Sequence, residues 1–540
     1  MSTALGIDVG TTHTKVALVD VDAPRTLACA SAPTPPPADL LALVADLTRR
    51  VLAQVPSAPV PGAIGVASMA ETGVPVGPDD EPRGDWLRWD GRRAGRQADE
   101  LAARLGRAEL FAATGVRASA KVPLATWAWL RDVASGRGAG GPAGARGPTS
   151  AVDLAGAAQM PSAPAGAIGS LHRGGRWAGA ADLVVLGLAG RLVTDHTLAG
   201  RTMAYRLGDA LPAGDGLPAG LPAAFDADLL AEVGLAPHQV PHVLRPGETV
   251  PLRRGPLTEA GLLAGTPVTV AGHDHAVGAF AAGVREPGDA ADSVGTTEVV
   301  CTVLTSDPDP GPVAQAGMSL VRTVRGDRPA LVAGSSSAGG AVAAWLAPLA
   351  PDDERAALLE RASGVDDALV ALLVGEGHPA GGGSGADEAF VVLPYVLGRQ
   401  TPAPDASATL RAVGAVPADP VDALRGVLLG AALQARWMLD AQAALAGRVP
   451  AQVRALGRPM LVNPAWAALK RWCSPAPLDV VADEEAVAAG AALLAAERAG
   501  LVGPAPALPV LPTPPDDLAP DPAAVDRRLQ AFVAAARATS

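Results

Sequence analysis

The sequence contains one short pattern twice, in two distant parts of the chain. In each copy an apolar run leads into a Gly-Thr-Thr turn, and a second run rich in apolar residues follows. The first copy spans residues 5–20 around Gly10, Thr11 and Thr12, and the second spans residues 291–300 around Gly295, Thr296 and Thr297. Apolar runs on both sides of a glycine-containing turn predict a β-hairpin. Two such hairpins predict two related domains facing each other across a cleft, with chance similarity of two short hairpins as the alternative.

The length of the chain agrees with this division. At 540 residues it exceeds what one hydrophobic core usually supports. Strands rich in Val, Leu and Ile alternate with Ala/Leu helices, which predicts an α/β fold. We place the boundary near residues 283–289, which gives an N-terminal lobe of residues 1–284 and a C-terminal lobe of residues 285–500.

Two segments differ in composition from these lobes. Residues 133–170 are dominated by Gly, Ala, Pro and Ser, which cannot bury enough apolar surface to become ordered, so we expect a mobile surface insertion. Residues 501–540 begin with a Pro-rich stretch before a short amphipathic run, and we expect this tail to lie outside the catalytic body.

Charge and hydropathy exclude several classes of protein. The net charge of −12 and the absence of a basic cluster argue against nucleic-acid binding, which depends on clustered Lys and Arg. The longest uncharged apolar run, residues 486–496, is shorter than the roughly 20 residues that cross a bilayer. The N-terminus has no signal-peptide pattern. We therefore expect a cytoplasmic protein without nucleic-acid or membrane partners.

The Gly-Thr turns have the chemistry of a phosphate site. Successive backbone N–H groups and hydroxyls in a tight turn can form a concave nest for phosphate oxygens. Asp8, at the end of the strand before the first turn, could hold Mg²⁺ directly or through water. The alternative is an ordinary hairpin with an aspartate at a buried strand end. The second turn favours the phosphate interpretation, because two nests facing one cleft can hold one polyphosphate.

A second polar segment follows a β-branched strand at residues 268–272. It contains His273, Asp274 and His275, and an Ala/Gly-rich stretch suited to a helix comes next. Phosphoryl transfer to an alcohol needs a base near the hydroxyl, and Asp274 at a helix N-terminus in the cleft fits that role. A His-Asp-His metal site is the competing interpretation. We expect neighbouring residues at a strand end not to converge on one ion.

With these motifs in place, residues 4–500 resemble the FGGY carbohydrate kinases, which belong to the actin-like, ribonuclease-H-like ATPase superfamily. The resemblance also rests on the order of weaker segments. These are residues 89–92 (WDGR), 188–202, 334–340 (GSSSAGG) with Trp345, 393–402 and 489–491 (AGA).

The resemblance implies two actin-like (ribonuclease-H-like) lobes that close over a central cleft. MgATP would bind mainly to the C-terminal lobe and the sugar mainly to the N-terminal lobe. It gives Asp8 the magnesium-organising role and Asp274 the role of base. The residues implied in ATP and phosphate binding are Gly10, Thr11, Thr12, Gly295, Thr296, Thr297, Gly339, Gly340 and Gly457. At Gly339 and Gly340 we expect the nucleotide to approach the backbone where a Cβ would collide.

The acceptor pocket is expected to differ from the commonest one in the family. Residues 69–72 (MAET) are similar to the Arg-Glu-Thr segment of glycerol kinases, with Ala70 in place of arginine. Glu71 could accept hydrogen bonds from vicinal hydroxyls, and Trp89 could supply an apolar face or belong to the core.

Three further residues complete the expected acceptor pocket. Asp90 is a candidate sugar ligand that could instead pair with Arg92. His273 and His275 stand where many relatives carry Gly and Gln, so we expect them to contact acceptor hydroxyls.

The expected adenosine segment departs from the family pattern. The usual Gly-Gly pair is reduced to Gly457, preceded by Ala455 and Leu456, whose side chains could crowd the nucleotide. Lys470, in the helix that follows, is expected to be a surface charge.

The sequence therefore predicts ATP- and Mg²⁺-dependent phosphorylation of a hydroxyl of a small sugar (ketose) or polyol. One alternative is a pseudokinase, a sugar- or nucleotide-sensing protein of the same fold. Another is an actin-like ATPase or chaperone module with protein partners, which would not need a base beside a hydroxyl pocket. Dimers are common in the family, so a homodimer is one state that the resemblance allows, but no segment marks a dimer surface and the oligomeric state stays open.

Overall fold

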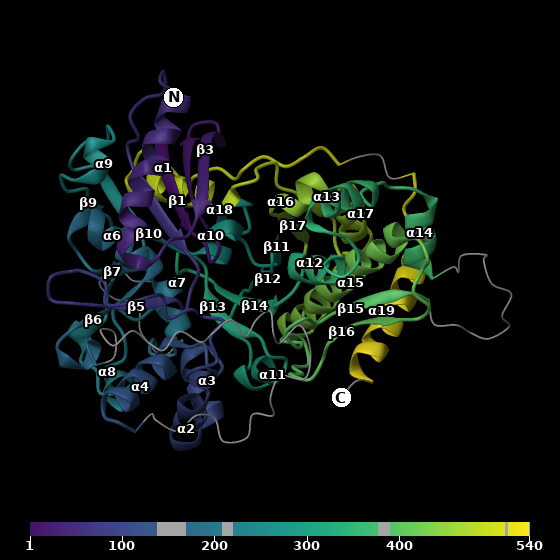
Figure 1. The fold of residues 1–540 in the computed structure, drawn as a ribbon, viewed down its shortest axis with the longest axis horizontal. Coiled ribbons are helices and arrows are strands. Elements are labelled where there is room, and N and C mark those ends of the chain that lie inside the picture. The colour runs from purple at the N-terminus through teal and green to yellow at the C-terminus, as the bar shows by residue number, and fades with distance from the viewer. Residues whose placement is uncertain (138–168, 208–219, 376–388, 514–516, 539–540) are drawn as a thin grey trace, which may run out of the picture.

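The structure is a computed structural model that describes residues 1–137, 169–207, 220–375, 389–513 and 517–538. It consists of two lobes side by side, each built around one β-sheet (Figure 1). Most of the expected insertion at residues 133–170 lies outside the described residues.

The first lobe contains a six-stranded sheet. In sheet order its strands are β3 (Arg25–Pro33), β2 (His13–Asp20), β1 (Thr3–Val9), β4 (Ile64–Ser68), β10 (Pro267–His273) and β9 (Val250–Pro251). β1 pairs antiparallel with β2 and parallel with β4, and β4 pairs parallel with β10. Every residue of β1 is buried, as expected for a sheet with helices on both faces.

The second lobe repeats this arrangement. Its strands, in sheet order, are β13 (Ser319–Arg322), β14 (Pro329–Ser335), β12 (Glu298–Val303), β11 (Asp289–Val294), β17 (Gln452–Leu456) and β18 (Leu478–Val480). β11 pairs antiparallel with β12 and parallel with β17, and β17 pairs parallel with β18. The β1–β2 and β11–β12 hairpins thus occupy equivalent places, and the prediction of two related domains is confirmed.

Helices cover both faces of the first sheet. Side chains of β1 alternate between these faces: Leu5 and Ile7 pack in the core beneath α1 (Leu40–Gln54) and α6 (Ala180–Ala189), whereas Ala4 packs on the opposite side with α18 (Ala486–Arg498). The small residues on that side allow α18 to lie directly on the strands.

The close approach of α18 requires glycine at two positions of the sheet. A Cβ on Gly6 would lie 1.8 Å from the carbonyl oxygen of Ala488, and one on Gly65 would lie 1.9 Å from that of Ala491. The boundary predicted near residues 283–289 assigns α18 to the second lobe, whereas its contacts are with the first sheet and with α10 (Asp274–Ala281). The C-terminal part of the chain therefore returns to complete the N-terminal lobe.

The lower part of the first lobe in Figure 1 is a largely helical layer. Its core includes Trp127 and Tyr205, both buried. Its elements are β5 (Gly73–Val76), α2 (Gly95–Leu105), α3 (Arg107–Thr114), α4 (Pro123–Ala134), β6 (Arg176–Gly179), β7 (Val193–Thr194), α7 (His196–Ala199), α8 (Ala227–Glu232) and β8 (His242–Val243). The short helix α9 (Pro256–Glu259) packs near α1.

The second lobe is organised around the long helix α15 (Pro420–Ala446), which packs on β12, β14, β15 and α17. The remaining elements are α11 (Pro310–Gln315), α12 (Gly339–Leu346), α13 (Asp352–Arg361), α14 (Asp367–Val374), β15 (Val391–Pro394), β16 (Leu410–Val413), α16 (Arg458–Val462) and α17 (Pro464–Cys473). In the part of the chain that the structure describes, no helix has both the length and the apolar character to cross a membrane.

The C-terminal helix α19 (Pro522–Arg537) corrects an expectation about residues 501–540. It packs against α14, α15 and α17, and Phe532 is 1% exposed. Arg399 Nη1 donates a hydrogen bond to the carbonyl oxygen of Ala536 at 2.7 Å. The prediction that this tail lies outside the body of the protein is wrong, because its apolar face completes the core of the second lobe.

Candidate active site

The segment around Asp274 lies where the two lobes meet. β10 ends at His273 and α10 begins at Asp274, and α10 contacts strands of both sheets. Gly272 has φ +131°, and a Cβ there would lie 2.4 Å from Oγ1 of Thr197. That hydroxyl accepts a hydrogen bond from the backbone N–H of His273 at 2.8 Å, which fixes the end of the strand.

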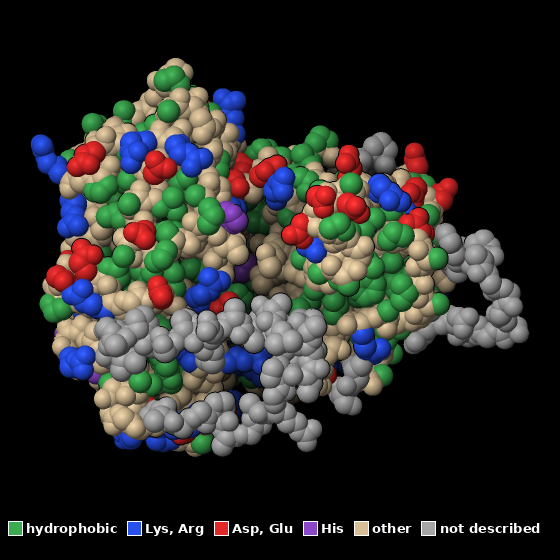
Figure 2. All heavy atoms as spheres, viewed as in Figure 1, with side chains coloured by type: hydrophobic (Ala, Val, Ile, Leu, Met, Phe, Trp, Pro, Cys, Tyr) green, Lys and Arg blue, Asp and Glu red, His purple; other side chains and the backbone are tan. Residues whose placement is uncertain are grey.

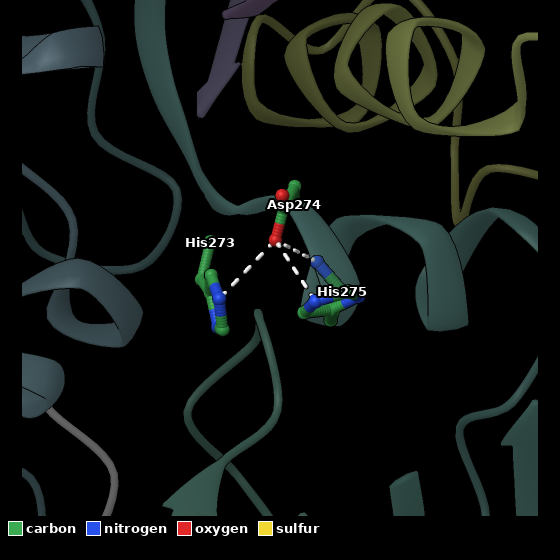
Figure 3. A group of neighbouring side chains, drawn as sticks. All are labelled: His273, Asp274 and His275. Atoms are coloured by element: carbon green, nitrogen blue, oxygen red, sulfur yellow. Dashed lines mark hydrogen bonds and ion pairs between the residues drawn. The ribbon is translucent and has the colours of Figure 1, made fainter. Parts of the chain in front are cut away.

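The three polar side chains of this segment converge (Figure 3). Oδ1 of Asp274 accepts a hydrogen bond from the backbone N–H of His275 at 2.7 Å, and it lies 3.1 Å from Nε2 of His273 and 3.8 Å from Nε2 of His275. One candidate ligand atom from each residue lies within 4.8 Å of the others. The expectation that these neighbours do not converge is therefore wrong, and metal ligation by the histidines remains a competing interpretation.

His273 is held in its neutral form. Burial, and then the nearby His275, Arg201 and Lys121, place its pKa well below the ordinary value. A neutral imidazole can donate one N–H to Asp274 without removing the charge of the carboxylate. The arrangement therefore orients Asp274 and leaves it able to accept a proton.

Asp274 opens onto a cavity of about 180 Å³ in the cleft between the lobes. Figure 2 shows a hollow between the two halves of the molecule. Of the predicted site residues, Thr11, Glu71, Trp89, His273, Asp274, His275 and Thr297 line this cavity. Asp90 does not: its side chain is exposed and lies 3.4 Å from Arg88, instead of pairing with Arg92.

The first Gly-Thr turn anchors Trp89. The backbone N–H of Gly10 donates to the carbonyl oxygen of His13 at 3.0 Å, which closes the turn. Nε1 of Trp89 donates to Oγ1 of Thr11 at 2.9 Å, and its backbone N–H donates to Oγ1 of Thr72 at 3.1 Å. Trp89 is thus fixed between the predicted phosphate turn and the predicted acceptor pocket.

Asp8 has the properties of a cation ligand. Its side chain is buried, and Oδ1 has no hydrogen-bond partner among the described residues. Burial, and then the charge of Asp274, raise its pKa to about 7. Lys15 opposes this shift, but its Nζ lies 2.5 Å from Glu485. Two neighbouring carboxylates with an unsatisfied oxygen fit the oxygen-rich coordination that Mg²⁺ prefers.

The second turn rests on the N-terminus of α12. The backbone N–H groups of Gly339 and Gly340 donate to the carbonyl oxygens of Gly295 and Thr296, each at 2.9 Å. A Cβ on Gly339 would lie 2.7 Å from the Gly295 oxygen. The structure thus gives a different reason for a glycine at position 339. The packing of α12 on the turn leaves no room for a Cβ there, whether or not a nucleotide is bound.

The altered adenosine segment is less unusual than the sequence suggested. Ala455 and Leu456 lie in β17, and both side chains are buried in the core. Gly457 follows with φ +111°, and a Cβ there would lie 2.1 Å from the carbonyl oxygen of Val294. The expected crowding by residues 455 and 456 is wrong, because a strand directs these side chains into the core.

Lys470 is a buried ion-pair residue instead of a surface charge. Its Nζ donates to Oδ2 of Asp292 at 2.8 Å and also to Oε1 of Glu298, and all three side chains are 1% exposed. The prediction failed because it treated the lysine in isolation. Four positions earlier stands the buried Trp466, so helical spacing already placed Lys470 on the apolar face of α17.

The acceptor end of the cavity contains two cations that the sequence interpretation gave no role. Arg201 binds Oε1 of Glu71 through Nη2 at 2.6 Å and Nε at 3.2 Å. Lys121 Nζ lies 4.0 Å from Oε2 of the same carboxylate. Glu71 has φ +63°, a conformation that costs a non-glycine residue energy and recurs at functional sites. Its pKa is lowered because these cations, Arg201 foremost, outweigh the effect of burial.

Comparisons with known proteins agree with this architecture. Residues 290–499 match the model of the C-terminal domain of the FGGY family of carbohydrate kinases. The xylulose kinase from Rhodospirillum rubrum is 21% identical with a TM-score of 0.73, covering 99% of this chain and 98% of that one. No curated protein sequence matches the chain.

Two further solved structures share the fold. Gluconate kinase from Lactobacillus acidophilus is 17% identical with a TM-score of 0.73, covering 99% of this chain and 96% of that one. Glycerol kinase from Plasmodium falciparum, solved with ADP, is 13% identical with a TM-score of 0.72, covering 100% and 98%. These likenesses confirm the expected α/β fold with two actin-like lobes. Residues 290–499 thus resemble the C-terminal domain of the FGGY carbohydrate kinases, and the whole chain shares the fold of these solved kinases.

Proposed function

We propose that this protein is an ATP-dependent kinase that phosphorylates a hydroxyl of a small sugar or polyol, with Asp274 as the general base. One observation carries the proposal: Thr11 from the first turn, Thr297 from the second turn and Asp274 line the same cavity. A polyphosphate held by the two turns and a hydroxyl beside Asp274 would therefore meet in one place.

In the proposed reaction, Asp274 accepts the proton of the acceptor hydroxyl while the hydroxyl oxygen attacks the γ-phosphorus of ATP. A new P–O bond forms, the bond to the bridging oxygen breaks, and ADP leaves. His273 and the backbone N–H of His275 orient the carboxylate for this step. Mg²⁺, when held by Asp8 directly or through water, would neutralise charge on the phosphates.

The structural neighbours are named as kinases of a ketose, a sugar acid and a polyol. Their shared fold supports carbohydrate phosphorylation and leaves the acceptor class open. The pseudokinase alternative loses support, because the residues that made the adenosine segment look defective lie in a core strand.

The test is acceptor-dependent ADP release by the pure protein across pentuloses, hexuloses, pentitols, aldonates and glycerol. Asp274→Asn should lower kcat by about 10²–10⁴-fold, because a positioned base contributes that much. Asp99→Asn is the matched control and should leave kcat unchanged, since Asp99 is an exposed residue of α2 paired with Arg107. ATP binding without ADP release for any acceptor would contradict the proposal and favour a pseudokinase.

A further inference from the structure

The acceptor side of the cavity contains two cations beside its two carboxylates. Lys121, just before α4, and Arg201 both line it, together with Glu71 and Asp274. Arg201 is 7% exposed and is committed to Glu71 through two nitrogen atoms. The charges of Arg201 and Glu71 therefore balance each other. Asp274 contacts His273 and the backbone N–H of His275, which leaves Lys121 as the cation without a close acidic partner.

Lys121 is poorly paired within the described part of the chain. Its Nζ is 4.0 Å from Oε2 of Glu71, which is beyond hydrogen-bonding distance, and it makes no hydrogen bond to another described residue. Its side chain is 33% exposed, so the ammonium group is accessible to a ligand. Its three N–H donors thus have no hydrogen-bond acceptor among the described residues.

The charged neighbours of this lysine are one glutamate and two arginines. Glu71 raises the pKa of Lys121, but burial and the neighbouring Arg201 and Arg117 outweigh it, so the pKa lies below its ordinary value. The same two cations, Arg201 and Lys121, help to lower the pKa of His273. An added anion at this end of the cavity would relieve both effects, whereas a hydroxyl would not.

We propose that the acceptor is a sugar acid, a polyhydroxy carboxylate whose carboxylate binds Lys121 while one of its hydroxyls is presented to Asp274. The proposal rests on the kinase function proposed above and specifies its substrate class. Glu71 has a positioning role in this arrangement: held by Arg201, it keeps a negative charge near Lys121 without occupying the lysine's hydrogen bonds.

The experiment compares acceptors that share a carbon skeleton and differ at one end, pentitols against pentonates and hexitols against hexonates. Calorimetry without nucleotide measures binding, and ADP release measures kcat/KM. We expect at least one acid to exceed its matched alcohol in affinity and in kcat/KM by about 10-fold or more, because hydrogen bonds to charged groups are the stronger ones.

Variants of Lys121 test whether this residue causes the preference for an acid over its matched alcohol. Lys121→Met should weaken binding of the acid by about 10–100-fold and leave the alcohol unchanged, and Lys121→Arg should restore much of the difference. Arg107→Met, an exposed cation of α3 outside the cavity lining, is the matched control and should change neither. Melting temperatures of all variants establish that each one is folded.

Three results would overturn the inference. Acids could bind no better than alcohols, Lys121→Met could weaken both equally, or it could raise only the KM for ATP, which would assign Lys121 to the nucleotide phosphates. Each of these leaves the kinase function intact if any acceptor yields ADP. Acid binding without ADP from any acceptor would instead support the pocket assignment and contradict the proposed function.

Discussion

The β1–β2 and β11–β12 hairpins occupy equivalent places in their sheets, and they differ in the acidic side chains beside their turns. Asp8 stands two residues before Gly10, whereas Asp292 stands three residues before Gly295. Because strand side chains alternate between faces, these aspartates point to opposite sides of their hairpins. Ser293 occupies the position equivalent to Asp8.

The surroundings of the two aspartates differ accordingly. Among the described residues, one oxygen of each aspartate has no hydrogen-bond partner, but the charged neighbour of Asp8 is another carboxylate, Asp274. Asp292 is joined to Lys470, which also binds Glu298. The first hairpin would thus hold a cation near the proposed chemistry, whereas the second is tied by a buried ion cluster to the helix behind it. On this proposal, one repeated element has a chemical role in one lobe and a supporting role in the other.

Removing the lysine of this cluster should have the largest effect on stability. Lys470→Met leaves two buried carboxylates without their cation, which should lower the free energy of unfolding by about 3–5 kcal/mol. Lys15→Met in the first hairpin breaks a partly exposed pair and should cost about 1 kcal/mol or less. Urea unfolding measures both.

A third variant shows how much of the lost stability comes from the unbalanced charges and how much from lost packing. Lys470→Met combined with Asp292→Asn and Glu298→Gln removes all three charges and should recover much of the lost stability. If Lys470→Met alone proves as stable as the wild type, the contrast between the hairpins has no energetic basis.

The cation site of the first hairpin should show itself in the pH dependence of stability. Since the folded-state pKa of Asp8 is about 7 and its ordinary value is 3.8, the folded protein binds this proton more tightly than the unfolded chain. Its contribution to stability therefore falls as pH rises from about 4 to 7. Asp8→Asn should remove this fall, which thermal unfolding without Mg²⁺ would measure.

Magnesium provides the complementary measurement. Mg²⁺ should raise the melting temperature of the wild type more at pH 8 than at pH 5.5, because only the carboxylate binds the cation. In Asp8→Asn the Mg²⁺ affinity should fall by about 10–100-fold. An unchanged Mg²⁺ response in this variant would show that the cation is held elsewhere.

The packing of α12 on the second turn predicts a smaller, selective effect. Gly339→Ala places a methyl group against the Gly295 carbonyl and should displace the turn, raising the KM for ATP by about 10-fold. Gly95→Ala in α2 is the matched control, because a Cβ there would meet only the Cβ of Ala120 at 3.9 Å and should leave the KM for ATP unchanged. Equal effects of the two variants would refute the packing argument.

Ser293→Ala should have the smallest effect. If the second hairpin holds no cation, the variant should stay within about 0.5 kcal/mol of the wild type in stability and keep its Mg²⁺ response. A lost Mg²⁺ response would mean that the two hairpins are more alike than their acidic residues indicate.

Features encoded by short stretches of sequence were predicted well. Both hairpins, their turns and the strand-to-helix step at Asp274 follow from local patterns of apolar residues, glycines and polar residues. The errors concern contacts between distant segments. Lys470 pairs with Asp292, 178 residues away, and Arg201 pairs with Glu71, 130 residues away. The return of α18 to the first sheet and the docking of α19 on the second lobe are errors of the same kind.

The sequence by itself determined the two-lobed plan, the position of the two turns and the strand-to-helix step at Asp274, because turn chemistry and strand periodicity act over a few neighbouring residues. Tertiary structure alone decided which charges are neutralised. It buried Lys470 between two carboxylates, committed Arg201 to Glu71 and left Lys121 facing the cavity. The physical reason is that burial and Coulombic pairing depend on distances in space, which the linear order of residues does not specify.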